Sequence, residues 1–208
     1  EQDILKPGTA FPLIRALHKL NDGGEQLVEI IIMSKNSADT SLRIFNSIEH
    51  YGLPISRAAL VSGASIVPYL NAFRTDLFLS ADEKDVQEAI NANVAAGIIC
   101  SHSNLPIDPT ADIEQIRIAF DGDAVIFSDE SEKIYQAQGL EAFAEHEHLN
   151  AQKPLPEGPF AKLLKTISAI QQGFEEGTVP IRTALVTARN APAHERVIRT
   201  LQAWDIRI

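Results

Sequence analysis

The sequence has little of three things that would define a protein class at once: cysteine, long apolar runs and positive charge. Its 208 residues include one cysteine, Cys100, which excludes an internal disulfide and favours a reducing compartment. Following Ile98-Ile99, Cys100 is expected to be a small buried residue. No apolar run approaches the roughly 18–20 residues that span a bilayer. The polar start, Glu1-Gln2-Asp3, is unlike a signal peptide. These absences predict a soluble, cytoplasmic chain with no membrane partner.

Positive charge is scarce, since 18 Lys and Arg residues stand against 28 Asp and Glu residues, for a net charge of −10. Such a chain offers no broad basic surface, so a nucleic acid polymer is not an expected partner. A small anion remains a candidate ligand if a cation or a cluster of backbone amides neutralises it. The composition, 45% apolar and 22% charged, is otherwise typical of a globular protein.

Short apolar runs rich in Ile and Val alternate with stretches that have helical spacing. The runs predict buried strands at 28–33, 58–61, 77–79, 95–99, 116–120 and 184–186. The amphipathic stretches predict helices around 13–20, 42–48, 86–90, 163–170 and 197–204. This alternation predicts an α/β fold with a mainly parallel sheet.

The chain also repeats itself at an offset of 153 residues. Similar residues fall on one another without gaps: Ser34 on Thr187, Ala38 on Ala191, Arg43 on Arg196, Ile44 on Val197, Ile48 on Leu201, Tyr51 on Trp204 and Leu53 on Ile206. Shared α/β architecture alone would explain the apolar period, but it explains the arginine and the aromatic less readily. The pattern favours duplication of one α/β unit.

The repeat suggests two related units, 1–112 and 113–208. The first copy continues past Leu53 to Asp82, whereas the second ends at Ile208, so we expect about 25–30 further residues by comparison with the first copy. The second copy opens with the strand at 116–120, and nothing equivalent precedes Glu1. On this hypothesis the sequence is truncated at both ends.

The strongest local pattern is a strand that ends on Asp121-Gly122-Asp123. Ligands of open α/β sheets bind beyond the carboxyl ends of the strands, and two carboxylates there suit Mg²⁺. Gly122 lets the chain turn so that neighbouring amides face a phosphate. Asp121 is placed for nucleophilic attack on phosphorus, and Asp123 for proton transfer to and from the reacting oxygens. A bare Asp-x-Asp is also common in Asx-type turns, and that alternative stays open.

A second strand ends on Thr187-Ala188-Arg189. The Thr187 hydroxyl could bind a phosphate oxygen or cap the helix that follows. Arg189 could reach an anion or be solvated. Thr187 and Ala188 join Gly122 as the candidate phosphate-binding residues.

Taken together, these strings resemble a known family. Asp-x-Asp after one strand, then Thr after a later strand, is the order of the first two motifs of haloacid-dehalogenase-like phosphatases. Longer strings resemble the cytosolic 5′-nucleotidase I family and cover nearly the whole chain: 45–51 (FNSIEHY), 79–82 (LSAD), 119–132 (AFDGDAVIFSDESE) and 180–189 (PIRTALVTAR).

The resemblance implies a Rossmann-like haloacid-dehalogenase fold and Mg²⁺-dependent hydrolysis of nucleoside 5′-monophosphates through an aspartyl-phosphate. Asp121 would be the nucleophile and Asp123 the acid/base, and both would belong to the metal site. The family's third and fourth motifs, a lysine and an acidic pair, are expected beyond Ile208. For that reason we expect little or no activity from residues 1–208 alone.

The first copy lacks this chemistry, because Leu79-Ser80-Ala81-Asp82 replaces the expected acidic pair. Its Lys35 and Asn36 are candidate substrate-binding residues, as are Arg189 and Phe127 in the second copy, although turn chemistry or core packing would also explain them. Trp204 is expected in the core. His146 and His148 flank Glu147, but side chains two apart point to different helix faces, so a solvated helix is favoured over a zinc site.

Two alternatives to a 5′-nucleotidase remain: a non-catalytic nucleotide-binding paralogue and a phosphatase of another small phosphate ester. Retention of Asp121, Asp123 and Thr187 argues against the first of these. The family resemblance also implies a homo-oligomer.

Overall fold

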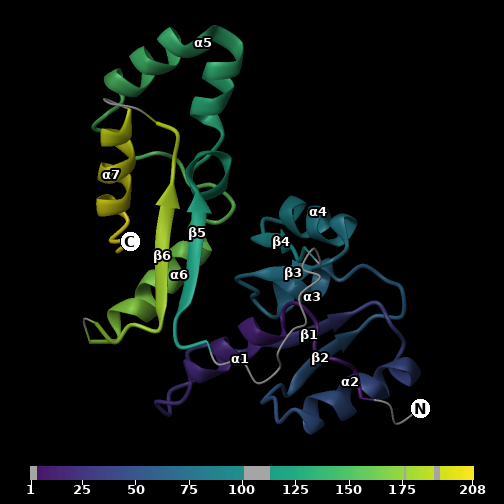
Figure 1. Cartoon of the computed structure of the whole chain (residues 1–208). Coiled ribbons are helices and arrows are strands. Elements are labelled where there is room, and N and C mark those ends of the chain that lie inside the picture. Colours follow the sequence, from purple (N-terminus) through teal and green to yellow (C-terminus); the bar gives the residue numbers. More distant parts are fainter. Residues whose placement is uncertain (1–3, 101–112, 176, 190–192) are drawn as a thin grey trace. The chain divides into compact units, whose positions relative to one another are not determined.

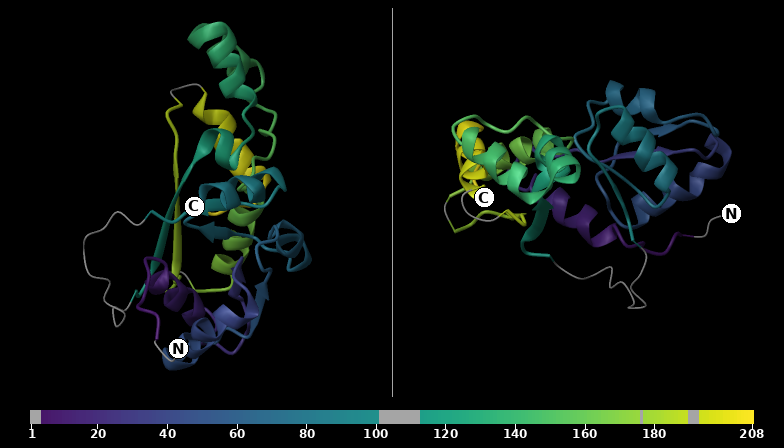
Figure 2. Two further views of the ribbon diagram at one scale, coloured as in Figure 1. Left: turned by 90° about the vertical axis from the view of Figure 1, so that its right-hand side faces the viewer. Right: turned by 90° about the horizontal axis from the view of Figure 1, so that it is seen from above.

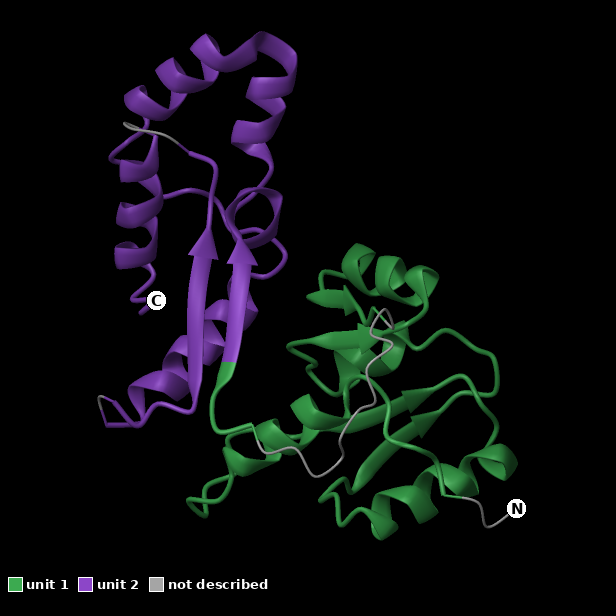
Figure 3. Ribbon diagram, viewed as in Figure 1, with its two compact units in different colours: residues 1–116 green, residues 117–208 purple. Residues whose placement is uncertain are grey.

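The structure is a computed structural model that describes residues 4–100, 113–175, 177–189 and 193–208. The chain divides into two compact units, Glu1–Ile116 and Arg117–Ile208, which are coloured separately in Figure 3. The predicted boundary at 112 lies outside the described residues, and so does Ala191 of the repeat.

Unit 1 alternates helices and strands (Figure 1). Its elements are α1 (Phe11–Lys19), β1 (Ile31–Ser34), α2 (Ala38–His50), β2 (Arg57–Leu60), α3 (Val67–Ala72), β3 (Phe78–Ser80), α4 (Glu83–Asn91) and β4 (Ala96–Ile98). β1 pairs in parallel with β2, and β3 pairs in parallel with β4. One apolar cluster, with Leu70 and Ala89 fully buried at its centre, also takes in Met33 of β1 and Phe78 of β3. The two strand pairs of unit 1 therefore share a core.

Unit 2 is built on two longer strands, β5 (Ile116–Asp121) and β6 (Ile181–Val186), which are hydrogen-bonded to one another. Figures 1 and 2 show them running side by side in the same direction. The other elements are a wide turn at Gly122–Ile126, α5 (Glu130–Leu149), α6 (Ala161–Gln172) and α7 (His194–Ala203). α6 buries Leu163, Leu164 and Ile167 in the core of this unit.

The α/β class and all six predicted strands are confirmed, each within a few residues. The structure adds α3 and most of α5 to the predicted helices. In place of one extended sheet, the described residues form three separate two-stranded sheets. Each strand has only three to six residues, so it can form few hydrogen bonds to a further strand that would join two of these sheets. The expectation that Cys100 is buried is wrong, because β4 ends at Ile98 and the cysteine lies exposed beyond it.

None of the helices in the described ranges is both long and apolar enough to cross a membrane.

The repeat at an offset of 153 extends to individual hydrogen bonds. α2 and α7 end in the same way, on the aromatic residues Tyr51 and Trp204, each followed by a residue with positive φ. In both helices a hydroxyl in the last turn donates to the carbonyl four residues earlier, and the chain closes with the same backbone bond. The bonds are Ser47 Oγ to Arg43 O and Thr200 Oγ1 to Arg196 O, both 2.7 Å, and Leu53 N to Ile48 O and Ile206 N to Leu201 O, both 3.0 Å.

The turn after β5 is fixed by a segment far along the chain. Its ends are joined by a bond from Phe127 N to Gly122 O of 2.9 Å. Gly158 N donates to Ile126 O at 2.9 Å, and Phe160 N donates to Val125 O at 3.0 Å. A Cβ on Gly158 would lie 2.3 Å from Phe127 O, so only glycine lets the two segments approach this closely.

Gly158→Ala should therefore destabilise unit 2 by about 1–3 kcal/mol, because the added methyl group must push the turn away. Gly23→Ala is the control, since nothing lies within 4 Å of a Cβ there, and it should change stability by less than about 0.5 kcal/mol. Urea unfolding of both variants measures the difference. Equal stability of the two would show that the close approach is not needed.

Candidate functional site

The Asp-x-Asp motif and the threonine motif meet at the carboxyl ends of β5 and β6. Asp121, the last residue of β5, is exposed, and Gly122 behind it is buried. A Cβ on Gly122 would lie 3.5 Å from Val186 O and 3.6 Å from Thr187 Cβ. Two segments separated by more than 60 residues are thus in contact at the sheet edge where α/β proteins bind ligands.

The turn after Asp121 gives each motif residue a different environment. Asp123 has extended backbone angles, whereas Ala124 has a φ of 61°, in the left-handed region. The reversal at Ala124 leaves Asp123 half-buried and brings Ile126 and Phe127 into the core. Asp121 therefore faces solvent, while Asp123 faces the interior of unit 2.

Arg189, three residues past the end of β6, forms an ion pair with Asp123. Its Nε lies 3.1 Å from both carboxylate oxygens of Asp123, and its Nη2 lies 2.5 Å from one of them. The Arg189 side chain is almost completely buried. The sequence allowed a free anion-binding or solvated arginine, but in the structure its guanidinium is engaged within unit 2.

Glu147 of α5 was missed by the sequence reasoning. The predicted solvated helix at 145–148 is wrong for this residue, because its side chain is fully buried. Its carboxylate accepts hydrogen bonds from Ser131 Oγ at 2.7 Å, from Arg196 Nη1 at 2.9 Å and from Arg189 Nη1. Asp123, Arg189, Glu147 and Arg196 therefore form a continuous line of alternating charges, which we call the charge chain.

A break within α5 makes the Ser131–Glu147 bond possible. Sixteen residues of straight helix would separate the two by about 24 Å. At Gly139, however, φ is 83° and ψ is −176°, and Figure 1 shows α5 bent into an arch. The bend returns the second half of the helix to the first, which is why helical periodicity along one face did not identify Glu147 as buried.

The charge chain shifts the pKa of two of its members. Burial alone would raise the pKa of Glu147, but the Ser131 hydrogen bond and the charges of Arg189 and Arg196 outweigh it and hold that pKa below its usual value. Burial would likewise lower the pKa of Arg189, yet Asp123 and Glu147 together raise it. Glu147 is therefore ionised although no part of its side chain reaches water.

Thr187 accepts a hydrogen bond on Oγ1 from Arg189 N at 3.2 Å. The alternative that it caps the following helix is wrong, since α7 begins at His194 with Ala193 in the capping position. Ser34, its repeat partner, makes the corresponding bond with Asn36 N at 3.1 Å. Thr187 keeps its hydroxyl proton available for a ligand, and Ala188 beside it is exposed.

The remaining candidates each have a local environment of their own. Lys35 Nζ is paired with Asp85 in unit 1, and Asn36 is exposed in the same loop. Phe127 is fully buried, with its ring centroid 5.7 Å from that of Trp204, so it packs in the core and presents no face to a nucleobase. Asp82, from the string that replaces an acidic pair, caps α4 by accepting from Lys84 N and Asp85 N.

The described residues contain no group of three or more His, Cys, Asp or Glu side chains arranged to hold a metal ion. His146 pairs with Glu130 and Glu147, while His148 is exposed. Because Asp123 is engaged by Arg189, Asp121 is the motif carboxylate open to a cation. One carboxylate has the oxygen chemistry that Mg²⁺ prefers but is only part of its usual ligand set.

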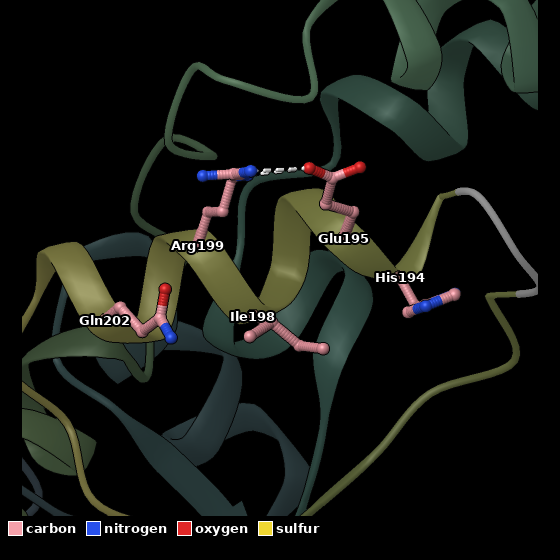
Figure 4. A pocket seen from close by; sticks show the side chains of 5 residues that line it. All are labelled: His194, Glu195, Ile198, Arg199 and Gln202. Atoms are coloured by element: carbon pink, nitrogen blue, oxygen red, sulfur yellow. Dashed lines mark hydrogen bonds and ion pairs between the residues drawn. The ribbon is translucent and has the colours of Figure 1, made fainter.

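A shallow hollow on α7 is unrelated to the charge chain. Figure 4 shows its lining side chains projecting from one helix: His194, Glu195, Ile198, Arg199 and Gln202. Arg199 Nη2 and Glu195 Oε1 are 2.7 Å apart, an exposed pair one helical turn apart that contributes little to stability. The candidate site therefore rests on the ends of β5 and β6.

Comparison with known proteins settles the family. The family model described as 5′-nucleotidase matches residues 1–208, the whole chain. The chain belongs to the 5′-nucleotidase family. Among curated proteins this nucleotidase-family chain is similar to human cytosolic 5′-nucleotidase 1B, with 38% identity over 220 residues that include all of this chain. It spans 36% of that relative's length. No solved structure matches it.

The charge chain of this nucleotidase-family protein should make its stability depend on acid pH. Because the folded pKa of Glu147 lies below its usual 4.5, its contribution is complete above that pH and is lost as the pH falls through the folded pKa. Glu147→Gln should cost about 3 kcal/mol or more at neutral pH, since the buried Arg196 loses its counterion and the buried Arg189 loses one of two. That difference from the unmodified protein should shrink in acid.

Urea unfolding between about pH 7 and pH 3 measures this change. Glu145→Gln is the matched control, because Glu145 lies exposed on the same helix and should leave the profile unchanged. A Glu147→Gln deficit that stayed constant across the whole range would contradict the assignment of an ionised, paired Glu147.

Proposed function

We propose that this chain carries the nucleophilic part of a phosphatase acting on nucleoside 5′-monophosphates, with a haloacid-dehalogenase-like arrangement in unit 2. The supporting observation is that Asp121 lies exposed at the end of β5, directly before Gly122, which lies against Thr187, and two residues before a half-buried Asp123 held by Arg189. The family match and the name of the human relative support a nucleotide as the substrate.

The proposed reaction has two steps. A carboxylate oxygen of Asp121 attacks phosphorus and forms an aspartyl-phosphate, while the bond to the nucleoside 5′ oxygen breaks. Asp123 enters this step with a proton on Oδ2, the oxygen that Arg189 Nε contacts at 3.1 Å, and gives that proton to the leaving oxygen. Water then attacks phosphorus, Asp123 takes a proton from it, and the Asp121 carboxylate departs with phosphate released. Atoms and protons balance, because Asp123 regains the proton that it lost.

The neighbouring residues suit an anionic substrate. Oγ1 of Thr187 accepts from Arg189 N, and its own hydroxyl proton can be donated to a phosphate oxygen. Gly122 is buried against Val186 and Thr187, and its lack of a side chain keeps the approach to the motif open. With Ala188 exposed beside it, this corner is our proposed phosphate position.

Mg²⁺ is part of the proposal, with Asp121 as the ligand that unit 2 provides. A bound Mg²⁺ would offset repulsion between the Asp121 carboxylate and the substrate phosphate. A location in the cytosol is also proposed, from the printed name of the relative. The expected homo-oligomer and the absence of a nucleic acid polymer as partner stay predictions.

The decisive test is phosphate release by the full-length protein from AMP, IMP, dCMP and a sugar phosphate, each with Mg²⁺ and with EDTA. Asp121→Asn should lower turnover by about 10³-fold or more, because the nucleophile is lost. Asp129→Asn is the control, an exposed carboxylate of the same unit that pairs only with Lys133.

Three outcomes separate the alternatives. Release from nucleotides alone supports the 5′-nucleotidase, whereas release from the sugar phosphate alone indicates a phosphatase of another ester. Binding without release from any substrate indicates a non-catalytic paralogue. Turnover that survives in Asp121→Asn would remove Asp121 as the nucleophile.

A further inference from the structure

The guanidinium of Arg189 joins two carboxylates that come from different parts of unit 2. Its Nε and Nη2 donate to Asp123, in the turn after β5, and its Nη1 donates to Glu147, near the end of α5. The ring of Phe143 lies beneath it, 5.5 Å from the guanidinium carbon. All three nitrogens are thus engaged, so a substrate phosphate could reach this arginine only by displacing a carboxylate.

The other oxygen of Glu147, Oε1, is bound by Arg196 and Ser131. Arg196 of α7 donates from Nη1 to Glu147 at 2.9 Å and from Nε to Lys153 O at 2.9 Å, so its own guanidinium is fixed. Ser131 Oγ donates to the same Glu147 oxygen at 2.7 Å. The position of Glu147 therefore depends on the helices α5 and α7 and on the loop before α6.

The planar guanidinium of Arg189 is bound by Asp123 on one side and Glu147 on the other, so the orientation of one carboxylate affects that of the other. Because Nε and Nη2 grip both oxygens of Asp123 side by side, the plane of that carboxylate follows the plane of Arg189. The plane of Arg189 is in turn set by Glu147. If Glu147 loses its charge, Arg189 keeps one partner instead of two and can rotate within its site.

We propose that Glu147 is a positioning residue, which acts through Arg189 to aim the Asp123 carboxylate at the leaving oxygen. This role rests on the proposed function, because it requires Asp123 to transfer the proton. Glu147 contacts neither substrate nor reacting atoms. The inference extends the site to α5, which the sequence motifs do not include.

Leaving-group chemistry distinguishes positioning from a merely structural role. A nucleoside 5′ oxygen leaves as a strongly basic alkoxide unless it receives a proton, so its departure depends on a well-aimed Asp123. The p-nitrophenolate of p-nitrophenyl phosphate is stable as an anion and leaves without a proton. Loss of this alignment should therefore slow the first step selectively with the nucleotide, whereas general loosening of the fold would slow that step with both substrates.

The experiment compares kcat/KM of the full-length protein with AMP and with p-nitrophenyl phosphate, because this ratio reports the first step, in which the leaving group departs, and not the hydrolysis of the shared aspartyl-phosphate. In Glu147→Gln, kcat/KM with AMP should fall by about 10–100-fold, part of the usual 10²–10⁴-fold contribution of proton transfer. With p-nitrophenyl phosphate kcat/KM should fall by less than about 3-fold. Glu145→Gln, exposed on the same helix, should match the unmodified protein with both substrates.

Arg189→Lys provides a second variant in case Glu147→Gln folds poorly. A lysine keeps the charge but cannot grip two carboxylates in one plane, so the same selective loss with AMP is expected. Equal losses of kcat/KM with both substrates, no loss, or a gain in either variant would overturn the positioning role while leaving the proposed function intact. An unmodified protein inactive toward both substrates would overturn the function and, with it, this role.

Discussion

Unit 2 depends on a single buried carboxylate. Glu147 lies between two guanidiniums, Arg189 and Arg196, and its removal would leave both of them buried with too little negative charge. A buried pair of this kind gains little over an apolar core, but breaking it is costly, because the remaining charge has no water to solvate it. The strands, the turn after β5 and both halves of α5 must therefore be in place together.

This dependence explains why the site can be only half predicted from sequence. The Asp-x-Asp and threonine motifs are local patterns at strand ends, and parallel strands bring their carboxyl ends to one edge. Their meeting at Gly122 and Thr187 follows from those rules. The burial of Glu147 follows from no local rule, because it depends on a reversal at Gly139 and on Arg196, 49 residues further along the chain.

The same contrast holds for the fold. Short apolar runs predicted all six strands, because a strand's apolar pattern lies within a few consecutive residues. The grouping of those strands into separate pairs depends on long-range bonds, such as Val61 N to Ser34 O at 2.9 Å. Phe127 is likewise a substrate-binding candidate from the sequence, with core packing as the alternative, and its burial against Trp204 decides for the core.

The repeat and the candidate site share one pair of equivalent positions. Asn36 and Arg189 follow the hydroxyl residues Ser34 and Thr187 at the same spacing and make the same backbone bond. In unit 1 the side chain at this position is exposed, whereas in unit 2 it is buried between carboxylates. The same backbone hydrogen bond thus precedes an exposed Asn36 in unit 1 and a buried, ion-paired Arg189 in unit 2.

The break at Gly139 has a wider consequence for how unit 2 can change. At a φ of 83° a side chain would be strained whatever space surrounds it, so the hinge of the arch is restricted to glycine. Residues added to either half of α5 would rotate Glu147 away from Arg189, by roughly 100° for each residue of a helix with 3.6 residues per turn. The length of the arch is therefore under geometric constraint, although Ser131 and Glu147 are the only buried residues of this helix.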